Sequence, residues 1–105
     1  MENKNLKIEQ DVLKKLFLRY NRIIVDNKQV LTGLPERCNY ENLLSLTEEA
    51  IKNIESYPTD KMHRWMGFVQ GILSVKGLIS VDEERNYTRP LLHSYHEDKP
   101  KSFGD

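Results

Sequence analysis

Apolar residues recur at every third or fourth position along most of this chain, which is the spacing of one face of an α-helix. Over residues 6–26 the spacing predicts a long amphipathic helix. Its apolar positions are Ile8, Val12, Leu13, Leu16, Phe17, Tyr20, Ile23 and Ile24. Residues 27–40 then interrupt the pattern with turn-forming residues at 32–35. This connector is long for a compact helical domain, so it fits either a short helical turn or a functional loop.

A second helical stripe begins after Asn39, whose side chain is suited to cap a helix start. Ser45 and Glu48 form an alternative capping box one turn later, so two starts remain open. We expect the helix to end at Tyr57 and Pro58, because proline cannot continue a helix. The members of the stripe are Tyr40, Leu43, Leu44, Thr47, Ala50, Ile51 and Ile54.

Residues 59–96 predict a hairpin of two antiparallel helices. Thr59 is placed to cap the first helix, and Gly77 is typical of a left-handed helix end. Ser80 and Glu83 form a capping box that starts the next helix, which leaves a turn of about two to three residues. The apolar stripe of the first helix consists of Met62, Trp65, Met66, Val69, Ile72 and Leu73.

Two features of this hairpin helix concern its packing. Phe68 and Val75 lie outside the narrow apolar stripe, which predicts that the helix is covered on more than one side. Gly67 and Gly71 share one face, and each costs about 1 kcal/mol relative to alanine inside a helix. Their shared face predicts a flat strip that another helix approaches. That helix belongs either to this chain or to a second copy of it, and both interpretations fit the glycines equally well.

Pro90 predicts that the last helix, from Val81 to about Tyr87, kinks or restarts. A restart places Leu91, Leu92 and Tyr95 on one side, and residues 1–5 and 97–105 are expected to form flexible tails. We therefore predict one all-α domain over residues 1–105. It is a small bundle of about four helices with a C-terminal antiparallel helix hairpin.

Composition narrows the function classes. The 105 residues are 38% hydrophobic and carry sixteen basic and sixteen acidic side chains. A net charge of zero argues against bulk binding of nucleic acid or of a membrane surface. The single Cys38 cannot form an intrachain disulfide, the start of the chain does not resemble a signal peptide, and no apolar run approaches the roughly 20 residues of a membrane span. These features predict a cytoplasmic protein.

The sequence lacks a complete motif for catalysis or for a metal. G-x-x-x-x-G-K-[ST], G-x-S-x-G and H-E-x-x-H are all absent. His93 and His96 have helical spacing but supply two ligands, where zinc needs three or four. Glu83 and Glu84 are adjacent on a helix and point apart, which does not suit acid–base catalysis. We therefore expect no catalytic residue, no metal and no cofactor.

The candidate site is a group of arginine and aromatic residues in the hairpin. Arg85 and Arg89 are one helical turn apart, and antiparallel packing is expected to bring them near Arg64. The group predicts a cationic pocket with a stacking surface for a phosphate, a nucleotide or an acidic protein segment. The alternative is that the arginines pair with nearby carboxylates and brace the hairpin. The predicted binding residues are Arg64, Trp65, Gln70, Arg85, Tyr87 and Arg89.

The stretch RWMGFVQGILSVKGLISVDEER, followed by TRP, resembles a C-terminal signature of small, mostly uncharacterised accessory proteins of tailed bacteriophages and prophages. The resemblance covers about a third of the chain and leaves the N-terminal helices unmatched. It implies a protein that acts by binding, since small phage proteins of this kind block host nucleases, defence complexes or signalling nucleotides. The matching positions are Arg64, Trp65, Gly67, Phe68, Gln70, Gly71, Gly77, Asp82, Glu83, Glu84, Arg85, Thr88, Arg89 and Pro90.

Two functional hypotheses follow. The first is a non-enzymatic phage or prophage protein that binds a host protein, such as a defence protein, and modulates or inhibits it. Its binding surface is the polar side of the hairpin or the loop 27–40. The second is an oligomeric small-ligand binder that sequesters a nucleotide or cyclic nucleotide between the arginines and the aromatic side chains.

Overall fold

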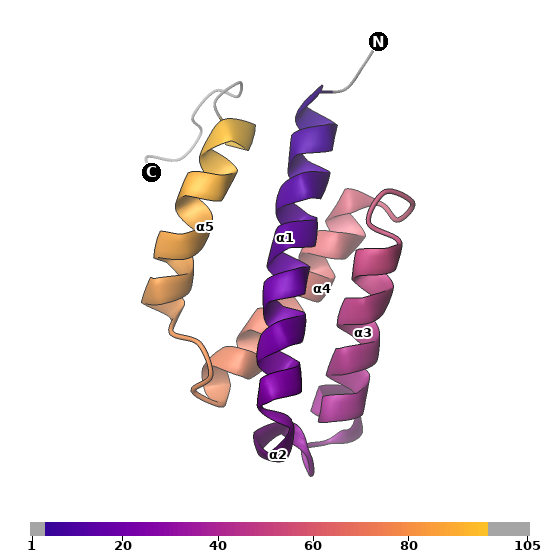
Figure 1. Ribbon diagram of the computed structural model, residues 1–105, viewed down its shortest axis with the longest axis vertical. Helices are drawn as coiled ribbons and strands as arrows, with labels where there is room; N and C mark the ends of the chain where they lie inside the picture. The colour runs from indigo at the N-terminus through magenta and orange to yellow at the C-terminus, as the bar shows by residue number, and fades with distance from the viewer. Residues whose placement is uncertain (1–3, 97–105) are drawn as a thin grey trace.

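The computed structural model describes the backbone of residues 4–96 and the side chains of residues 4–91. The chain forms four long helices joined by short connections (Figure 1). The elements are α1 (Lys4–Asp26), α2 (Lys28–Leu31), the 3-10 turn η1 (Glu36–Cys38), α3 (Tyr40–Lys52), α4 (Thr59–Val75) and α5 (Val81–His96). The predicted all-α bundle of about four helices is confirmed, and the described part of the chain contains no strand.

Helix α1 is the centre of the bundle. It lies between α5 on one side and the pair α3 and α4 on the other (Figure 1). Each of these three helices contacts α1 more than it contacts any other helix. The apolar stripe predicted from the sequence is the face that meets these helices, because burying it removes the most apolar surface from water. The residues of α1 with little or no exposure are Val12, Leu13, Leu16, Phe17, Tyr20 and Ile24.

The core consists of two clusters that share α1. The larger cluster joins α1 to α2, α3 and α4, and the smaller one lies between α1, α3, the following turn and the start of α4. Thr47 is the buried polar residue of α3. Its hydroxyl donates to the carbonyl of Leu43 at 3.0 Å and accepts from the side-chain amide of Asn21 at 3.0 Å. Both bonds satisfy a hydroxyl that would otherwise be costly to bury.

Three of the predicted helix ends follow from local hydrogen bonding. Asn39 caps α3 by accepting from the backbone amide of Asn42 at 3.0 Å. Gly77 ends α4 with a φ of +76°, and the amide of Leu78 donates to the carbonyl of Leu73 at 2.8 Å. Ser80 starts α5 by accepting from the amide of Glu83 at 3.3 Å. These caps confirm the starts of α3 and α5 and the end of α4.

Other expected helix ends were wrong. Helix α3 stops at Lys52, before Tyr57 and Pro58, because Asn53 caps its end and the chain turns over residues 53–56. Thr59 does not cap α4 but is its first residue, after Pro58. The chain between α4 and α5 spans residues 76–80, which is longer than the turn of two to three residues that the capping signals suggested.

Helix α5 runs without a break from Val81 to His96, so Pro90 lies inside one helix and does not start a new one. The chain reverses after α4, as the predicted hairpin requires, but α5 packs mainly against α1 (Figure 1). Residues 4 and 5, expected in a flexible tail, begin α1. The predicted tail 97–105 and the side chains of Leu92 and Tyr95 lie outside the described residues.

The outward face of α4 is not covered, contrary to the expectation from Phe68 and Val75. Phe68 is 40% exposed and Val75 is 85% exposed. Cβ atoms built on Gly67 and Gly71 would meet no atom within 4 Å. No described part of the chain therefore approaches the glycine strip, and close packing within the chain does not account for it.

Candidate functional site

A network of polar side chains joins α1, α4 and α5. The carboxylate of Glu84, on α5, is 6% exposed and accepts from two consecutive residues of α1. Arg19 donates from Nη2 at 2.7 Å and from Nε at 3.3 Å, and the hydroxyl of Tyr20 donates at 2.6 Å. The amide of Gln70, on α4, donates to the Tyr20 hydroxyl at 2.7 Å. Each buried polar group of the network therefore has a partner, as burial requires.

Burial and charge set the protonation states of this network. Burial raises the pKa of Tyr20 well above its ordinary value, and the hydrogen bond to Glu84 raises it further. The hydrogen bond to Glu84 also raises the pKa of Arg19. The Arg19 guanidinium in addition lies 4.2 Å from the ring centroid of Tyr87 on α5. The network thus holds the Glu84 carboxylate through three hydrogen bonds donated from α1.

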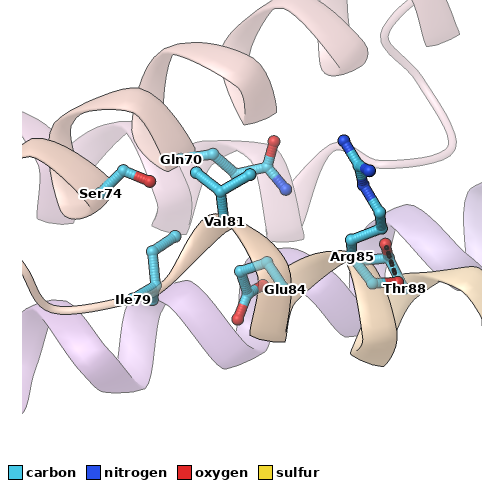
Figure 2. A pocket seen from close by; sticks show the side chains of 7 residues that line it. All are labelled: Gln70, Ser74, Ile79, Val81, Glu84, Arg85 and Thr88. Carbon is cyan, nitrogen blue, oxygen red and sulfur yellow. Dashed lines mark hydrogen bonds between the residues drawn. The ribbon is translucent and has the colours of Figure 1, made fainter.

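A cleft of about 240 Å³ opens between α4 and α5. Figure 2 shows Glu84 turned towards α1 and Arg85 turned the opposite way, towards the α4 side of the cleft. Among the described residues, Arg85 has no carboxylate partner. The lining residues are Gln70, Ser74, Ile79, Val81, Glu84, Arg85 and Thr88. The cleft therefore offers one cation, two hydroxyl groups and no aromatic side chain.

A wider groove of about 610 Å³ runs between η1, α3 and α4. Trp65, Phe68 and Leu46 give it an apolar lining, and Glu36, Arg37 and Asn42 give it polar groups. We call these six residues the α3–α4 groove. Trp65 is held in place by Tyr57, since the two rings meet edge to face with centroids 5.9 Å apart.

Cationic and hydrogen-bonding side chains surround the Tyr57 end of this aromatic pair. The Lys61 ammonium lies 4.1 Å from the ring centroid of Tyr57 and 5.1 Å from that of Trp65. The hydroxyl of Tyr57 donates to Glu49 at 2.6 Å, and this hydrogen bond raises the pKa of Tyr57. These contacts orient Trp65 with one side towards the core and one side towards the groove.

The predicted binding residues are divided among several surfaces. Gln70 and Arg85 meet at the α4–α5 cleft, whereas Trp65 lines the α3–α4 groove. Arg64 is exposed and pairs with Asp60, one turn earlier, at 3.6 Å. Tyr87 packs under Arg19 and not beside Arg64. The structure thus does not place an aromatic stacking surface in the cleft that contains Arg85.

Arg89 lies one helical turn after Arg85 and is exposed. It has no ion-pair partner within the described residues. The alternative that the arginines pair with nearby carboxylates holds for Arg64, which pairs with Asp60. It does not hold for Arg85 and Arg89, which have no carboxylate partner in the described chain.

The sequence analysis missed Arg19 and Tyr20 as partners of Glu84. A signal was available, because Val81, Glu84, Thr88 and Leu91 follow helical spacing and place a carboxylate in the middle of a half-apolar stripe. A carboxylate at such a position needs a buried partner. The identity of that partner, 65 positions away in the chain, is decided only by packing.

Metal chemistry finds no support in the described residues, where no group of three or more potential ligands comes together. His63 Nε2 instead lies 2.7 Å from Glu9 Oε2 on α1. The side chains of His93 and His96 lie outside the described part of the chain. None of the helices in residues 4–96 combines the length and the apolar character that crossing a membrane requires.

Comparison with family models, with curated proteins and with solved structures found no match to this chain.

Proposed function

We propose that this chain is a non-enzymatic accessory protein of the phage or prophage type. It binds a host protein in the bacterial cytoplasm and modulates or inhibits it, and host-defence proteins are the first class to test. The phage assignment rests on the resemblance of residues 64–90 to the signature described above. The binding assignment rests on the α3–α4 groove.

The observation that carries the proposal is the pairing of half-buried Trp65 with exposed Phe68 in this groove. Trp65 and Phe68 lie one turn apart beside Leu46, and Phe68 is 40% exposed. Aromatic side chains and arginine dominate the binding energy of protein interfaces, particularly when polar residues surround them. Arg37 and Asn42 provide such surroundings. The groove also brings Trp65 of the hairpin together with Glu36 and Arg37 of the loop 27–40. The sequence analysis treated the hairpin and this loop as alternative binding surfaces.

Capture of a host protein tests this proposal. The tagged chain is used to retain proteins from a bacterial lysate, in parallel with Phe68→Ala and with Leu18→Ala as the matched control. Leu18 is an exposed apolar residue of α1, outside the groove, with 50% exposure. We expect wild type and Leu18→Ala to retain the same protein, and Phe68→Ala to lose it at least about tenfold, as for an interface hot spot.

Binding of the retained protein is then measured directly through the fluorescence of Trp65, the only tryptophan. Equal retention by Phe68→Ala and Leu18→Ala, or a Trp65 signal unchanged by the partner, contradicts a role for the groove. Failure of every variant and of wild type to retain a protein contradicts the binding function itself.

The second candidate is an oligomeric protein that sequesters a nucleotide in the α4–α5 cleft. The observation in its favour is Arg85, whose charge has no carboxylate partner in the described chain. The volume and the lining of the cleft argue against nucleotide binding. Ligand pockets usually measure about 300–1,000 Å³, whereas this cleft measures about 240 Å³ and has no aromatic side chain for a base.

Thermal denaturation with a panel of nucleotides and cyclic nucleotides separates the candidates. A ligand present at about 100 times its Kd would stabilise the fold by about 2.7 kcal/mol. The second candidate requires such a shift in wild type, its loss in Arg85→Ala and its retention in Arg64→Ala, because Arg64 does not line the cleft. No shift with any of these ligands would exclude it.

A further inference from the structure

Over residues 81–91, the part of α5 whose side chains are described, the buried contact with the rest of the bundle is polar. It lies beside α1 and runs in the opposite direction (Figure 1), and it has few contacts with α4. Glu84 is the one buried residue among the α5 residues whose side chains are described. Val81 is 61% exposed and Tyr87 is 37% exposed, while Leu91 is half-buried against the larger core cluster. Little apolar surface of residues 81–91 is therefore removed from water.

The site that receives Glu84 belongs to the rest of the bundle. Arg19 and Tyr20 are on α1, and Gln70 is on α4. Tyr20 also accepts from the side-chain amide of Gln70 at 2.7 Å, a contact between α1 and α4 that does not involve α5 and that holds the hydroxyl in place. Without α5, the Tyr20 hydroxyl and the Arg19 guanidinium form a prepared receptor for a carboxylate.

The sequence of α5 also weakens its own helix. Pro90 lies inside the helix, and it lacks the amide proton that would bond the carbonyl four residues earlier. A helix with a missing hydrogen bond and little apolar contact opens locally before the rest of a fold unfolds. We therefore expect α5 to leave α1 while α1, α3 and α4 remain folded.

Three α5 residues that contact the bundle, within the part of the helix whose side chains are described, have the spacing of a helix bound in a groove. Glu84, Tyr87 and Leu91 occupy positions i, i+3 and i+7, which is the pattern of anchors in amphipathic helices that bind protein grooves. We infer that the α1 face beneath α5 is a second binding surface and that α5 is its displaceable cover. Its other occupant is a partner helix with an acidic residue, an aromatic residue three positions later and an aliphatic residue four positions after that.

The charges on both sides support this choice of occupant. Arg19 presents a guanidinium that needs an anion, and it also forms the cation–π contact with the ring of Tyr87. An acidic residue followed by an aromatic one at i+3 satisfies both contacts of Arg19. A basic helix would place like charge beside Arg19, and a purely aliphatic helix would leave the buried Tyr20 hydroxyl without an acceptor. This surface is distinct from the α3–α4 groove, and the inference goes beyond the function proposed there.

Hydrogen exchange on the full chain tests the inference. The protein is labelled with ¹⁵N, and an unlabelled peptide of residues 80–96 is added, so that only the amides of the protein are observed. In the free protein we expect amides of α5 to be at least about tenfold less protected than those of α1, α3 and α4. The peptide should then accelerate exchange of the α5 amides in proportion to its concentration, because it occupies the vacated face. Protection of α1 should not fall.

Two peptide variants serve as controls. The peptide with Glu84→Ala should have no effect, whereas the peptide with Glu83→Ala should act like wild type because Glu83 is exposed. If α5 is as well protected as α1 and α3, it opens only with the whole fold and the inference is wrong. If α5 opens locally but the wild-type peptide has no effect, or the Glu84→Ala peptide acts equally, the α1 face is not a carboxylate-reading surface.

Discussion

Replacing Glu84 by alanine removes the carboxylate at the junction of α1, α4 and α5. The hydroxyl of Tyr20, a fully buried residue, loses its acceptor, and Arg19 loses two donated hydrogen bonds. The two losses differ in size. Gln70 still donates to the hydroxyl oxygen, but a buried O–H donor left without an acceptor costs about 1–3 kcal/mol. The Arg19 side chain is 35% exposed, so water replaces its partner and the cost is about 0–1 kcal/mol.

The total expected loss is therefore about 1–4 kcal/mol in the free energy of unfolding, to which the lost charge in the first turn of α5 adds a few tenths. Glu83→Ala is the matched control, because it removes the same charge from the same turn at an exposed position. The difference between the two variants isolates the network. Tyr20→Phe is the reciprocal change. It leaves the Arg19–Glu84 pair intact and should cost about 1–2 kcal/mol.

Urea denaturation followed by far-UV circular dichroism and by Trp65 fluorescence is the assay. The circular dichroism signal reports all helices, whereas Trp65 reports the α3–α4 side of the bundle. We expect the free energy from both probes to fall for Glu84→Ala, with an earlier loss of helical signal if α5 leaves first. If Glu84→Ala and Glu83→Ala differ by less than about 0.5 kcal/mol, the network does not stabilise α5 and the reasoning is refuted.

Three further predictions follow from individual positions. The pKa of Tyr20 is raised in the fold, so its contribution to stability is complete below about pH 10 and decreases at higher pH. Above that pH, the urea midpoint of Tyr20→Phe should fall less steeply with pH than that of the wild type. Equal pH dependence of the two midpoints would contradict the raised pKa. Gly67→Ala and Gly71→Ala should each raise the free energy of unfolding by about 0.5–1 kcal/mol, and with it the melting temperature, because their Cβ atoms meet open space. Gly77→Ala should lower the melting temperature, since φ at this position is +76°. A lower melting temperature for Gly67→Ala or Gly71→Ala would contradict the exposed strip. Asn39→Ala should cost about 1 kcal/mol through the cap of α3, and an unchanged urea midpoint would show that the cap does not contribute.

Local features of the sequence were sufficient for most of the helices. The apolar spacing located α1, α3 and α4, because a helix in a small domain must turn one face to the core. Asn39, Gly77 and Ser80 set helix boundaries through hydrogen bonds or backbone angles within a few residues. The end of α3 was predicted too late, since the turn at 53–56 competes locally with a stripe that continues to Ile54.

The candidate site depended much more on tertiary structure. Helical spacing placed Arg85 and Gln70 in neighbouring elements, and they do line one cleft. It could not separate Trp65 from Arg85, because that requires knowing which side of α4 faces α3 and which faces α5. It also gave no indication of Arg19, although Arg19 is the cation that contacts both Glu84 and Tyr87.

By itself, the sequence determined that this protein is a bundle of amphipathic helices, where α3 and α5 begin and where α4 ends. Hydrogen bonds to neighbouring residues and the period of the helix contain that information. Only the tertiary structure decided that α5 packs on α1 and that Glu84 meets Arg19 and Tyr20 across more than sixty positions. The physical reason is that a helix stripe specifies that a face is buried but not which helix covers it. That choice depends on the arrangement of all the helices at once.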